Sequence, residues 1–222
     1  MLQQKSNGVT LPKVGIVTLN WNGLKHLKYF LPTVSNQTYN NFFTIVVDNG
    51  SNDDSIKFIN RHYPRVEVMD LKNNYGYSKG FNKGINLAIE KGAEYVLITN
   101  NDVVLDSNIL KEGVSLFKSD KKIGFMSGKI YELSTDKRFQ YAGGRVNFST
   151  LNMPSRGAGE LDIGQYEEIK DFEFMDDVCC LVSTNMIKKI GMYDEDFFFD
   201  YEETEWNHRI RTNNYKIVYN PK

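Results

Sequence analysis

"KVGIVTLNWNGLKHLKYFLPTVSNQTYNNFFTIVVDN" (residues 13–49) contains the pattern that decides the fold. Residues 13–20 and 43–49 are short apolar runs rich in Val and Ile, which is typical of buried strands. Between them, apolar side chains recur at helical spacing, at Leu24, Leu27, Phe30, Leu31 and Val34. The stretch therefore predicts a strand, a helix and a second strand.

The same alternation continues to about residue 106. Further strands are expected at 66–71 and 95–99, and further helices at 52–62 and 78–91. Strands and helices that alternate in this way form a parallel sheet with helices on both faces and right-handed connections. Ligands of such sheets bind beyond the carboxyl ends of the strands. This half of the chain therefore predicts a nucleotide-binding α/β unit.

After residue 106 the pattern becomes less regular. We expect helices at 107–119, at 185–190 and at the end of 194–211, and strands at 123–133, 173–184 and 215–221. Two short strands around Gly143-Gly144 (139–148) predict a hairpin, and residues 150–170 predict a polar loop. No linker-like stretch interrupts the chain, so we expect a polar N-terminal tail (1–12) and a single domain (13–222).

The composition argues against some classes of function. The 222 residues include 27 basic and 28 acidic side chains, so the overall charge does not recruit nucleic acid. No apolar run approaches the roughly 20 residues that cross a bilayer, and the N-terminus lacks the apolar stretch of a signal peptide. We therefore expect a cytoplasmic protein. The adjacent Cys179 and Cys180 are expected to be reduced, because neighbouring cysteines bridge only with strain.

Polar side chains follow three of the predicted strands at the point where each strand ends. Asn20, Asp48 and Asp102 fall at one edge of the expected sheet. Asn and Asp also favour turns, but a carboxylate directly after an apolar strand needs a partner or a ligand. A carboxylate can approach a diphosphate only through a cation, and Mg²⁺ or Mn²⁺ prefers such oxygen ligands. Asp102 as a metal ligand and Asp48 as a partner for a base or ribose form a consistent pair.

Five motifs occur in an order that points to a known family. They are VGIVTLNWNG (14–23), IVVDNGSNDDS (45–55), NNYGYSKGFNKGI (73–85), LITNNDVVLD (97–106) and GMYDEDFFFDYEETEWNHRI (191–210). Together they resemble family 2 glycosyltransferases of the GT-A fold, in particular the bacterial branch with rhamnosyltransferases and other cell-surface polysaccharide enzymes. The resemblance covers nearly all of residues 13–222. It implies a Rossmann-like mixed α/β sheet flanked by helices, with a nucleotide-sugar-binding half (13–106) and a smaller acceptor and catalytic half (107–222).

The resemblance also implies roles for single residues of the first half. Those expected around the nucleotide are Thr18, Asn20, Asp48, Gly76, Lys79 and Asn82. Lys79 is equally compatible with a solvated position on a helix. Asn100-Asn101-Asp102 occupies the place of the family's Asp-x-Asp motif, in which Asp102 would hold Mn²⁺ or Mg²⁺. Asn100 stands where the motif has its first Asp, which removes one charge from the metal site.

The stretch FFFDYEETEWNHR (197–209) matches the family's Glu-Asp motif. Glu202-Glu203 falls on that pair, whose second acid is the general base of an inverting transfer. The base takes the proton of the acceptor hydroxyl as that oxygen attacks the anomeric carbon. Glu203 is therefore the expected base, and Glu202 remains an alternative because Glu203 is longer than the Asp it replaces. Acids also favour helix N-termini, which suits Glu205 with Arg209 four residues on.

Three functions are compatible with these residues. The leading hypothesis is a metal-dependent inverting glycosyltransferase that uses a nucleotide-diphospho-sugar in surface-polysaccharide synthesis. A nucleotidyltransferase is less well supported, because the loop NWNG (20–23) lacks the Gly-rich, basic character typical of that class. A degenerate domain that binds nucleotide-sugar or glycan without transfer would fit Asn100 and the Glu202-Glu203 pair.

The substrates are expected only as classes. The donor would be a UDP- or dTDP-sugar, the acceptor a glycan or a lipid-linked glycan, and no nucleic acid takes part. A lipid-linked acceptor implies, by analogy, peripheral association with the inner face of the membrane. Relatives of this kind continue past the last predicted strand, so the resemblance implies an acceptor half that is truncated at its C-terminus.

Overall fold

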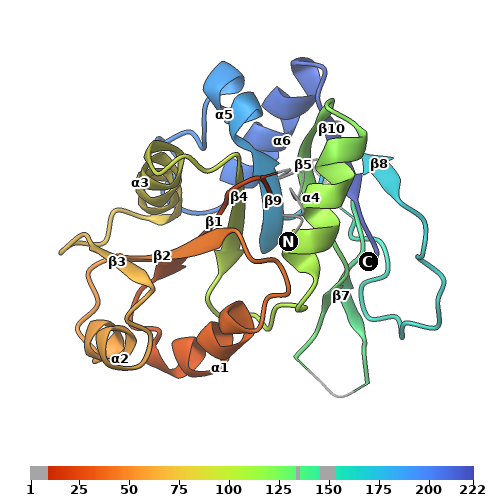
Figure 1. The fold of residues 1–222 in the computed structure, drawn as a ribbon. Helices are drawn as coiled ribbons and strands as arrows, with labels where there is room; N and C mark the ends of the chain where they lie inside the picture. The colour runs from red at the N-terminus through yellow and green to blue at the C-terminus, as the bar shows by residue number, and fades with distance from the viewer. Residues whose placement is uncertain (1–9, 134–135, 146–153) are drawn as a thin grey trace, which may run out of the picture.

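A central sheet lies between two layers of helices (Figure 1). The structure is a computed structural model that describes residues 10–133, 136–145 and 154–222. One face of the sheet packs against α1 (Leu24–Ser35), α2 (Ser55–His62) and α4 (Ile109–Ser119). The other face packs against α3 (Tyr77–Glu90), α5 (Thr184–Ile190) and α6 (Glu202–Thr212). The predicted α/β layering is therefore confirmed.

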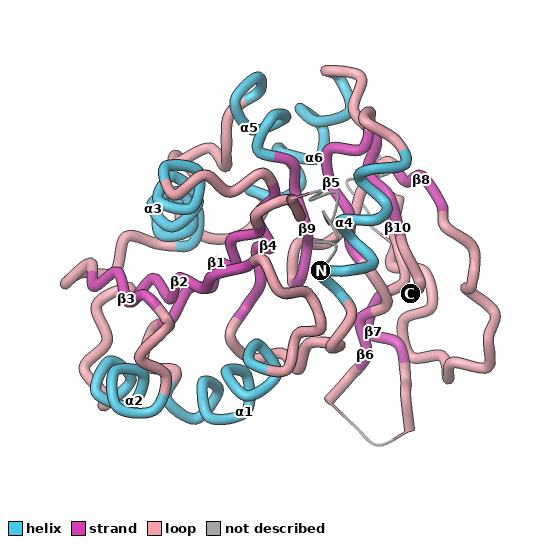
Figure 2. The backbone as a smooth tube through the Cα atoms, viewed as in Figure 1, coloured by secondary structure: helices cyan, strands magenta, loops and turns pink. Residues whose placement is uncertain are grey.

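The central sheet is mixed, with strand order β3-β2-β1-β4-β9-β5-β10-β8. The strands are β1 (Val14–Asn20), β2 (Phe42–Asp48), β3 (Glu67–Asp70), β4 (Tyr95–Asn100), β5 (Ile123–Ser127), β8 (Lys170–Phe172), β9 (Cys179–Ser183) and β10 (Lys216–Tyr219). The first four strands in the order are parallel, and β9 is antiparallel to both β4 and β5. Figure 2 shows β9 in its place between these two strands. β10 is parallel to β5, and β8 is antiparallel to β10. The parallel register places Asn20 beside Asp48 and Leu19 beside Asn100 at one edge.

Alternation of side chains along the strands creates one apolar core on each face of the sheet. In β1, Val14 and Ile16 belong to the core that contains α1, and Val17 belongs to the core that contains α3. In β9, Cys179 and Cys180 divide in the same way; both are buried and free, as expected. Consecutive side chains on opposite faces cannot approach each other, so this strand position itself keeps the two thiols apart.

A small second sheet replaces the predicted hairpin around Gly143-Gly144. β7 (Phe139–Tyr141) pairs antiparallel with the preceding β6 (Ile130–Tyr131). Gly143 has a φ of +103°, and a Cβ added there would lie 2.6 Å from the Phe172 ring. Gly143 therefore permits close packing against β8 instead of forming a tight turn. Residues 146–148 of the predicted hairpin lie outside the described residues.

Several element boundaries in the second half differ from the prediction, among them that of the strand expected at 123–133, which is divided into β5 and β6. The strand expected at 173–184 is shorter, because β9 begins only at Cys179. Before it, the Asp176 carboxylate accepts a hydrogen bond from the backbone N–H of Val178, a local turn that competes with strand pairing. The loop expected at 150–170 ends in β8, which forms because β10 supplies its pairing partner.

The described end of the N-terminal tail is bonded to the domain. The carbonyl oxygen of Leu11 accepts a hydrogen bond of 2.6 Å from the Asn41 amide. The carbonyl oxygen of Pro12 accepts one of 2.6 Å from the Tyr39 hydroxyl. Residues 11 and 12 are therefore bonded to the segment between α1 and β2 and do not project from the domain.

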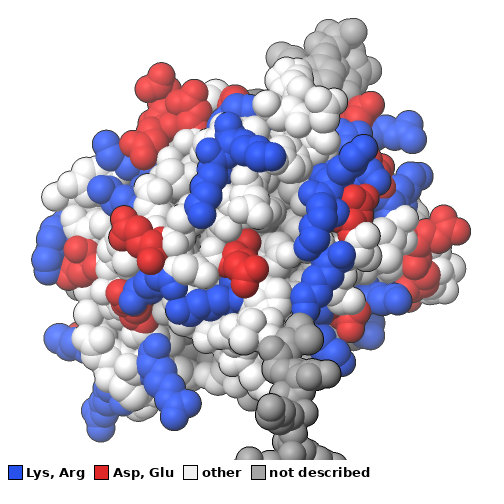
Figure 3. Space-filling model, turned by 45° about the horizontal axis from the view of Figure 1, so that its top comes forward, with Lys and Arg blue, Asp and Glu red and all other residues white. Residues whose placement is uncertain are grey.

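The surface carries charges of both signs. Figure 3 shows basic and acidic side chains interspersed over one face, in keeping with the formal net charge of −1. Across the described ranges, no helix combines the length and the apolar character needed to cross a bilayer.

Candidate active site

Three side chains from three neighbouring strand ends meet at the carboxyl edge of the parallel strands. Asn20 donates a hydrogen bond of 2.9 Å to Asp48 Oδ2, and Asn101 donates one of 2.7 Å to Asn20 Oδ1. The other carboxylate oxygen, Asp48 Oδ1, accepts the backbone N–H of Ser51 at 2.8 Å. Asn20 and Asp48 are both fully buried. Because buried polar groups need partners, each of these side chains fixes the position of the next.

A second set of contacts ties the end of β2 to the start of α3. The Asn49 amide donates to the Asn74 side chain (2.8 Å) and to the Gly76 carbonyl oxygen (3.1 Å), and its Oδ1 accepts the Tyr75 N–H (2.9 Å). Gly76 precedes α3 with a φ of +83°. An added Cβ at Gly76 would lie 2.6 Å from the carbonyl oxygen of Phe198, so only glycine fits here.

Asn100 faces a different set of side chains from its neighbour Asn101. The Tyr77 hydroxyl lies 3.3 Å from Asn100 Oδ1 and 3.2 Å from Asp177 Oδ1. The Tyr193 hydroxyl donates a short hydrogen bond to the other oxygen, Asp177 Oδ2. Tyr77 begins α3, Asp177 precedes β9 and Tyr193 precedes α6, so this network joins the two halves of the chain.

Asp177 is an acid in an apolar, acidic setting. It is 6% exposed, and its burial raises its pKa to about 8, although the Tyr193 hydrogen bond acts in the opposite direction. The charges of Asp176, Glu203 and Glu202 raise the pKa further. At neutral pH Asp177 is therefore mainly protonated, and it can donate one hydrogen bond.

The expected catalytic pair begins α6. Asp200 and Tyr201, the two residues before it, both have left-handed φ values, 69° and 70°. Two consecutive non-glycine residues in this region are unusual, and such strain is found where a side chain must be aimed. The strained turn directs the chain into α6 so that Glu202 is buried and Glu203 is partly exposed.

Both acids have raised pKa values. Burial raises the pKa of Glu202 to about 7, with a further contribution from the charges of Glu203 and Asp200. Burial also raises the pKa of Glu203, helped by the charges of Asp176 and Asp200. Glu202 Oε2 is buried without a hydrogen-bond partner in the part of the chain that the structure describes. Carboxylates with raised pKa values are suited to proton transfer near neutral pH.

The other predictions for this helix concern structure. Glu205 pairs with Arg209 through Oε1 and Nε at 2.8 Å, which confirms the expected pair four residues apart. Trp206 is fully buried, and its indole N–H donates to the Gly191 carbonyl oxygen at 3.0 Å. These contacts hold α6 in place without involving the side chains of Glu202 and Glu203.

Asp102 lies just beyond these networks. Its side chain is exposed and makes no hydrogen bond or ion pair with any described residue. A free carboxylate at this edge fits a cation that takes its remaining ligands from a diphosphate, as Mg²⁺ and Mn²⁺ commonly do. The described residues contain no group of three or more acids, histidines or cysteines that could hold a metal unaided. The donor set therefore fits a metal that is held jointly with the substrate.

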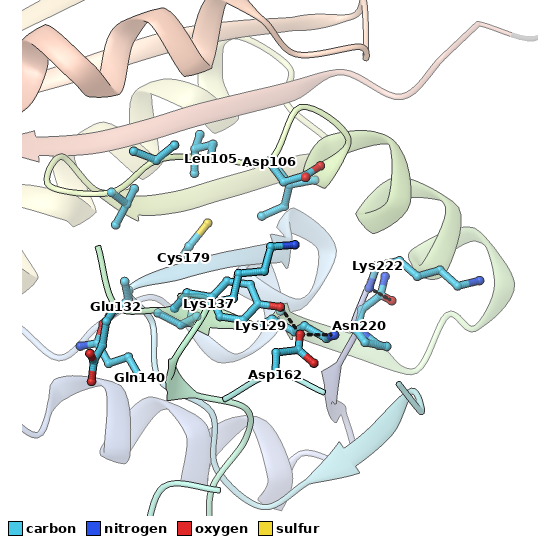
Figure 4. Close-up of a pocket in the computed structure, with 18 of the residues that line it drawn as sticks. Leu105, Asp106, Lys129, Glu132, Lys137, Gln140, Asp162, Cys179, Asn220 and Lys222 are labelled. Atoms are coloured by element: carbon cyan, nitrogen blue, oxygen red, sulfur yellow. Dashed lines mark hydrogen bonds and ion pairs between the residues drawn. The ribbon is translucent and has the colours of Figure 1, made fainter. Parts of the chain in front are cut away.

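A cavity of about 1300 Å³ opens beside Asn100 and Asp102. Leu105 and Asp106 lie on one side of it, and Lys129 and Asp162 lie on the other (Figure 4). Lys129 Nζ pairs with Asp162 Oδ2 at 2.8 Å, and this pair is largely buried. The cavity thus begins at the carboxyl edge of β4 and extends across the second half of the chain, where a substrate larger than a nucleotide could bind.

The remaining residues predicted to bind the nucleotide, Thr18, Asn82 and Lys79, differ in their surroundings. Thr18 is fully buried, and its hydroxyl lacks a hydrogen-bond partner among the described residues. Asn82 is buried on α3 and donates to the Tyr193 carbonyl oxygen at 2.9 Å. Lys79 lies 3.8 Å from Glu195 and over the Tyr75 ring. Within the described ranges, none of the three forms a hydrogen bond or an ion pair with the Asn20–Asp48–Asn101 network.

Comparison with known proteins gives the family. The family model for Glycosyl transferase family 2 matches residues 14–190, most of the chain. The chain belongs to glycosyl transferase family 2. This result confirms the family that the five sequence motifs resemble.

Two relatives are named as sugar transferases. The low-salt glycan biosynthesis hexosyltransferase Agl10 of Haloferax volcanii is 24% identical over 93% of this chain and 64% of its own length. The dTDP-rhamnosyl transferase RfbF of Shigella flexneri is 28% identical over 91% of this chain and 63% of its own length. The chain therefore spans less than two thirds of either relative.

Solved structures show the same fold. TarS of S. aureus (residues 1–349) aligns with 94% of this chain and 60% of its own, with a TM-score of 0.64 and 15% identity. The mannosyltransferase PcManGT of Pyrobaculum calidifontis, solved with GDP-Man and Mn²⁺, aligns with 96% of this chain and 56% of its own, with a TM-score of 0.67 and 14% identity. The expected GT-A fold of this glycosyltransferase domain is therefore confirmed.

The sequence motifs did not identify the Tyr77–Asp177–Tyr193 network. Both tyrosines lie in apolar helix and turn patterns that are typical of core residues. The only sequence signal is the pair Asp176-Asp177 directly before an apolar strand. A carboxylate in that position needs a partner. Nothing in the sequence says that the partners are Tyr77, 100 positions before Asp177, and Tyr193, 16 positions after it.

Proposed function

We propose that this chain transfers a sugar from a nucleotide-diphospho-sugar to an acceptor hydroxyl, with inversion at the anomeric carbon, in surface-glycan synthesis. The observation that carries the proposal is the exposed Asp102 carboxylate, unpaired among the described residues, beside the ordered Asn20–Asp48–Asn101 edge. Because the side chains of this sheet edge are hydrogen-bonded to one another, they offer a rigid surface on which the nucleotide can bind. Membership of glycosyl transferase family 2 supports the reaction class.

The donor would lie across the carboxyl edge of β1, β2 and β4. Asp48 has both oxygens occupied and is fully buried, so in this conformation it orders Asn20 and the turn at Ser51. Asn100 and Asp102 both line the cavity and would face the diphosphate. The diphosphate would thus lie beside the Asn100 amide and the Asp102 carboxylate.

Asp102 would hold Mn²⁺ or Mg²⁺ together with the donor's phosphates. The metal would neutralise charge that develops on the departing diphosphate. The likeness to a structure solved with GDP-Man and Mn²⁺ supports a divalent ion, and the chemistry of the Asp102 site is compatible with one. Because Asn100 adds no charge, this chain would rely on the substrate for most of the ligands.

Glu203 would act as the general base. It is partly exposed, so an acceptor hydroxyl can reach its carboxylate, whereas Glu202 is buried. Glu203 would take the proton of that hydroxyl as the oxygen attacks, and a single displacement inverts the anomeric configuration. The raised pKa of Glu203 makes its carboxylate a stronger base than an ordinary glutamate, which favours proton transfer from the hydroxyl. Glu202 would remain beside it as a buried acid.

The substrates follow the relatives in class. One relative is named as a dTDP-rhamnosyl transferase, and TarS has been solved with UDP, which supports a dTDP- or UDP-sugar donor. The acceptor would be a glycan or a lipid-linked glycan that enters through the cavity between Asp102 and Lys129. A lipid-linked acceptor would place the reaction at the inner, cytoplasmic face of the membrane through peripheral association.

The test is calorimetric binding of UDP, dTDP and GDP, each with and without Mn²⁺. Asp102→Asn removes the charge at constant shape, and Asp54→Asn is a matched control at an exposed carboxylate outside the site. We expect one nucleotide to bind only with Mn²⁺, and we expect that binding to be lost in Asp102→Asn and kept in Asp54→Asn. Absence of binding by the wild-type chain, or equal binding by Asp102→Asn, would refute the proposed site.

The product of turnover separates this reaction from the alternatives. Incubation with the matching nucleotide-sugar should release a nucleoside diphosphate, because the bond to the sugar breaks. A nucleotidyltransferase working in reverse on a nucleotide-sugar and pyrophosphate would instead produce a nucleoside triphosphate. A domain that only binds would release neither product.

A further inference from the structure

The Tyr77 hydroxyl lies between two possible hydrogen-bond acceptors, Asp177 and Asn100, but it can donate only one hydrogen bond. It lies 3.2 Å from Asp177 Oδ1 and 3.3 Å from Asn100 Oδ1. A phenolic hydroxyl donates one hydrogen bond and can accept others. If Tyr77 donates to Asn100, the contact with Asp177 is satisfied only when Asp177 carries a proton and donates it to Tyr77. The three side chains therefore form a chain of hydrogen bonds with a direction.

The direction of this chain determines which end of the Asn100 amide faces the cavity. With Asp177 protonated, Tyr77 donates to Asn100 Oδ1, and the amide NH₂ group is left to face outward. With Asp177 ionised, Tyr77 donates to Asp177, and its oxygen can accept a bond only from the Asn100 NH₂ group. The amide must then turn over and present its oxygen instead.

The Asn100 amide has the orientation of the first of these two arrangements. Asn100 presents Oδ1 to Tyr77, and its NH₂ group makes no hydrogen bond with any of the described residues. Asn100 is also one of the residues that line the cavity beside Asp102. Two hydrogen-bond donors without a partner at a cavity wall suit an oxygen-rich ligand.

The surroundings of Asp177 favour its protonated form. The groups that act on it are Tyr77 from α3, Tyr193 from the segment before α6, Asp176 and Cys180 from the β9 segment, and Glu202 and Glu203 from α6. All are neutral or acidic, and no lysine or arginine is among these described neighbours. Burial together with acidic neighbours raises the pKa of Asp177 to about 8, which agrees with the orientation of the Asn100 amide.

We propose that Asp177 and Tyr77 are positioning residues, which hold the Asn100 amide so that its NH₂ group donates a hydrogen bond to a phosphate oxygen of the nucleotide diphosphate. The inference rests on the proposed function, because it needs a nucleotide at this edge of the sheet. The proposed hydrogen bond gives a reason for an amide, that of Asn100, at a position close to the Asp102 carboxylate. A second carboxylate at this position would repel the phosphate, whereas an oriented NH₂ group attracts it.

The test is the affinity for the nucleoside diphosphate that binds the wild-type chain, measured by calorimetry with Mg²⁺ from pH 7 to pH 9. We expect wild-type affinity to fall about tenfold as Asp177 ionises, the value of one hydrogen bond to a charged group. Asp177→Asn keeps a neutral donor in place of the acid, so its affinity should match wild type at pH 7 and stay level as the pH rises. Tyr77→Phe breaks the chain, so its affinity should be about tenfold lower at pH 7 and should also stay level.

Tyr75→Phe is the matched control, because Tyr75 is an exposed tyrosine two residues away and its ring faces Lys79 and Lys83. It should follow wild type at every pH. Ionisation of the nucleotide and of Glu202 is common to all four proteins, so the ratio of each variant to wild type isolates the effect of Asp177. If Asp177→Asn does not fold, the pH profile of Tyr77→Phe alone decides.

Two results would overturn the inference alone. One is a wild-type chain that binds nucleotide and an Asp177→Asn variant with the same pH dependence. The other is a Tyr77→Phe variant with wild-type affinity and pH dependence. Failure of the wild-type chain to bind any nucleotide would instead refute the proposed function, and the inference with it.

Discussion

Asn100 and Asn101 are consecutive, but their side chains bond on opposite faces of the sheet. Asn101 donates to Asn20 in the network that includes Asp48, on the face covered by α1 and α2. Asn100 meets Tyr77 on the face covered by α3 and α6. Because side chains alternate between the two faces at this strand end, two adjacent residues join the proposed nucleotide-binding edge to the proposed catalytic half.

The two acids at the start of α6 should differ in their effect on turnover. Glu203→Gln should lower kcat by a factor of about 10² to 10⁴, the usual contribution of a general base. Donor affinity should change little, because the base acts on the acceptor. Hydrolysis of the nucleotide-sugar, with water as acceptor, measures this without knowledge of the acceptor. Glu202→Gln is the isosteric comparison and should cost less than tenfold; a larger loss there than in Glu203→Gln would exchange the two roles.

Loss of Asn20 should weaken both the fold and the nucleotide site. Asn20→Ala leaves the buried Asp48 Oδ2 and the Asn101 amide without the partner that joins them. We expect the free energy of unfolding to fall by roughly 1–3 kcal/mol, the cost of unsatisfied buried polar groups. Urea denaturation measures the change. Asn40→Ala, at an exposed asparagine, should stay within about 0.5 kcal/mol of wild type, and an equal loss in both variants would contradict the role given to the network.

Stability should fall as the pH rises through the neutral range. The pKa of Asp177 is raised from its usual 3.8 to about 8 in the folded chain, so the folded state holds a proton that the unfolded state has lost. The stabilising contribution of that proton is complete below pH 4 and is lost as the pH approaches 8. Urea denaturation at pH 5, 7 and 8.5 should show this decline in wild type and a shallower one in Asp177→Asn. Parallel curves for the two proteins would show that Asp177 is not the group responsible.

Gly76 should tolerate no side chain. Gly76→Ala meets both a left-handed φ of +83° and the Phe198 carbonyl oxygen at 2.6 Å. Gly92 also has a φ of +83°, but an added Cβ there meets nothing within 4 Å. Gly92→Ala should therefore cost only the backbone term of about 1 kcal/mol, and Gly76→Ala should cost at least 1 kcal/mol more. Thermal or urea denaturation of both variants gives the difference, and equal costs would mean that Phe198 moves aside freely.

The first half of the fold could be predicted because its signals are local. Apolar strands and helices alternate along residues 13–100, and the parallel arrangement that follows brings Asn20 beside Asp48 without further information. The position of Glu202 and Glu203 at the start of a helix, and the Glu205–Arg209 pair, also follow from local spacing.

The rest depends on contacts between distant parts of the chain. β8 has three residues and forms only because β10 lies beside it, and β7 finds its partner before it in the sequence instead of after it. The Tyr77–Asp177 contact joins residues a hundred positions apart. No periodicity marks such pairs, because each residue satisfies the local pattern of its own segment.

The position of β9 has a consequence for how the chain is made. β9 (Cys179–Ser183) lies between β4 and β5 in space but is synthesised long after both. Until it leaves the ribosome, the apolar strand Tyr95–Asn100 has one unpaired edge, of the kind to which other chains add. The nascent protein therefore needs protection over that interval, and a fragment that ends near residue 106 should aggregate when expressed alone.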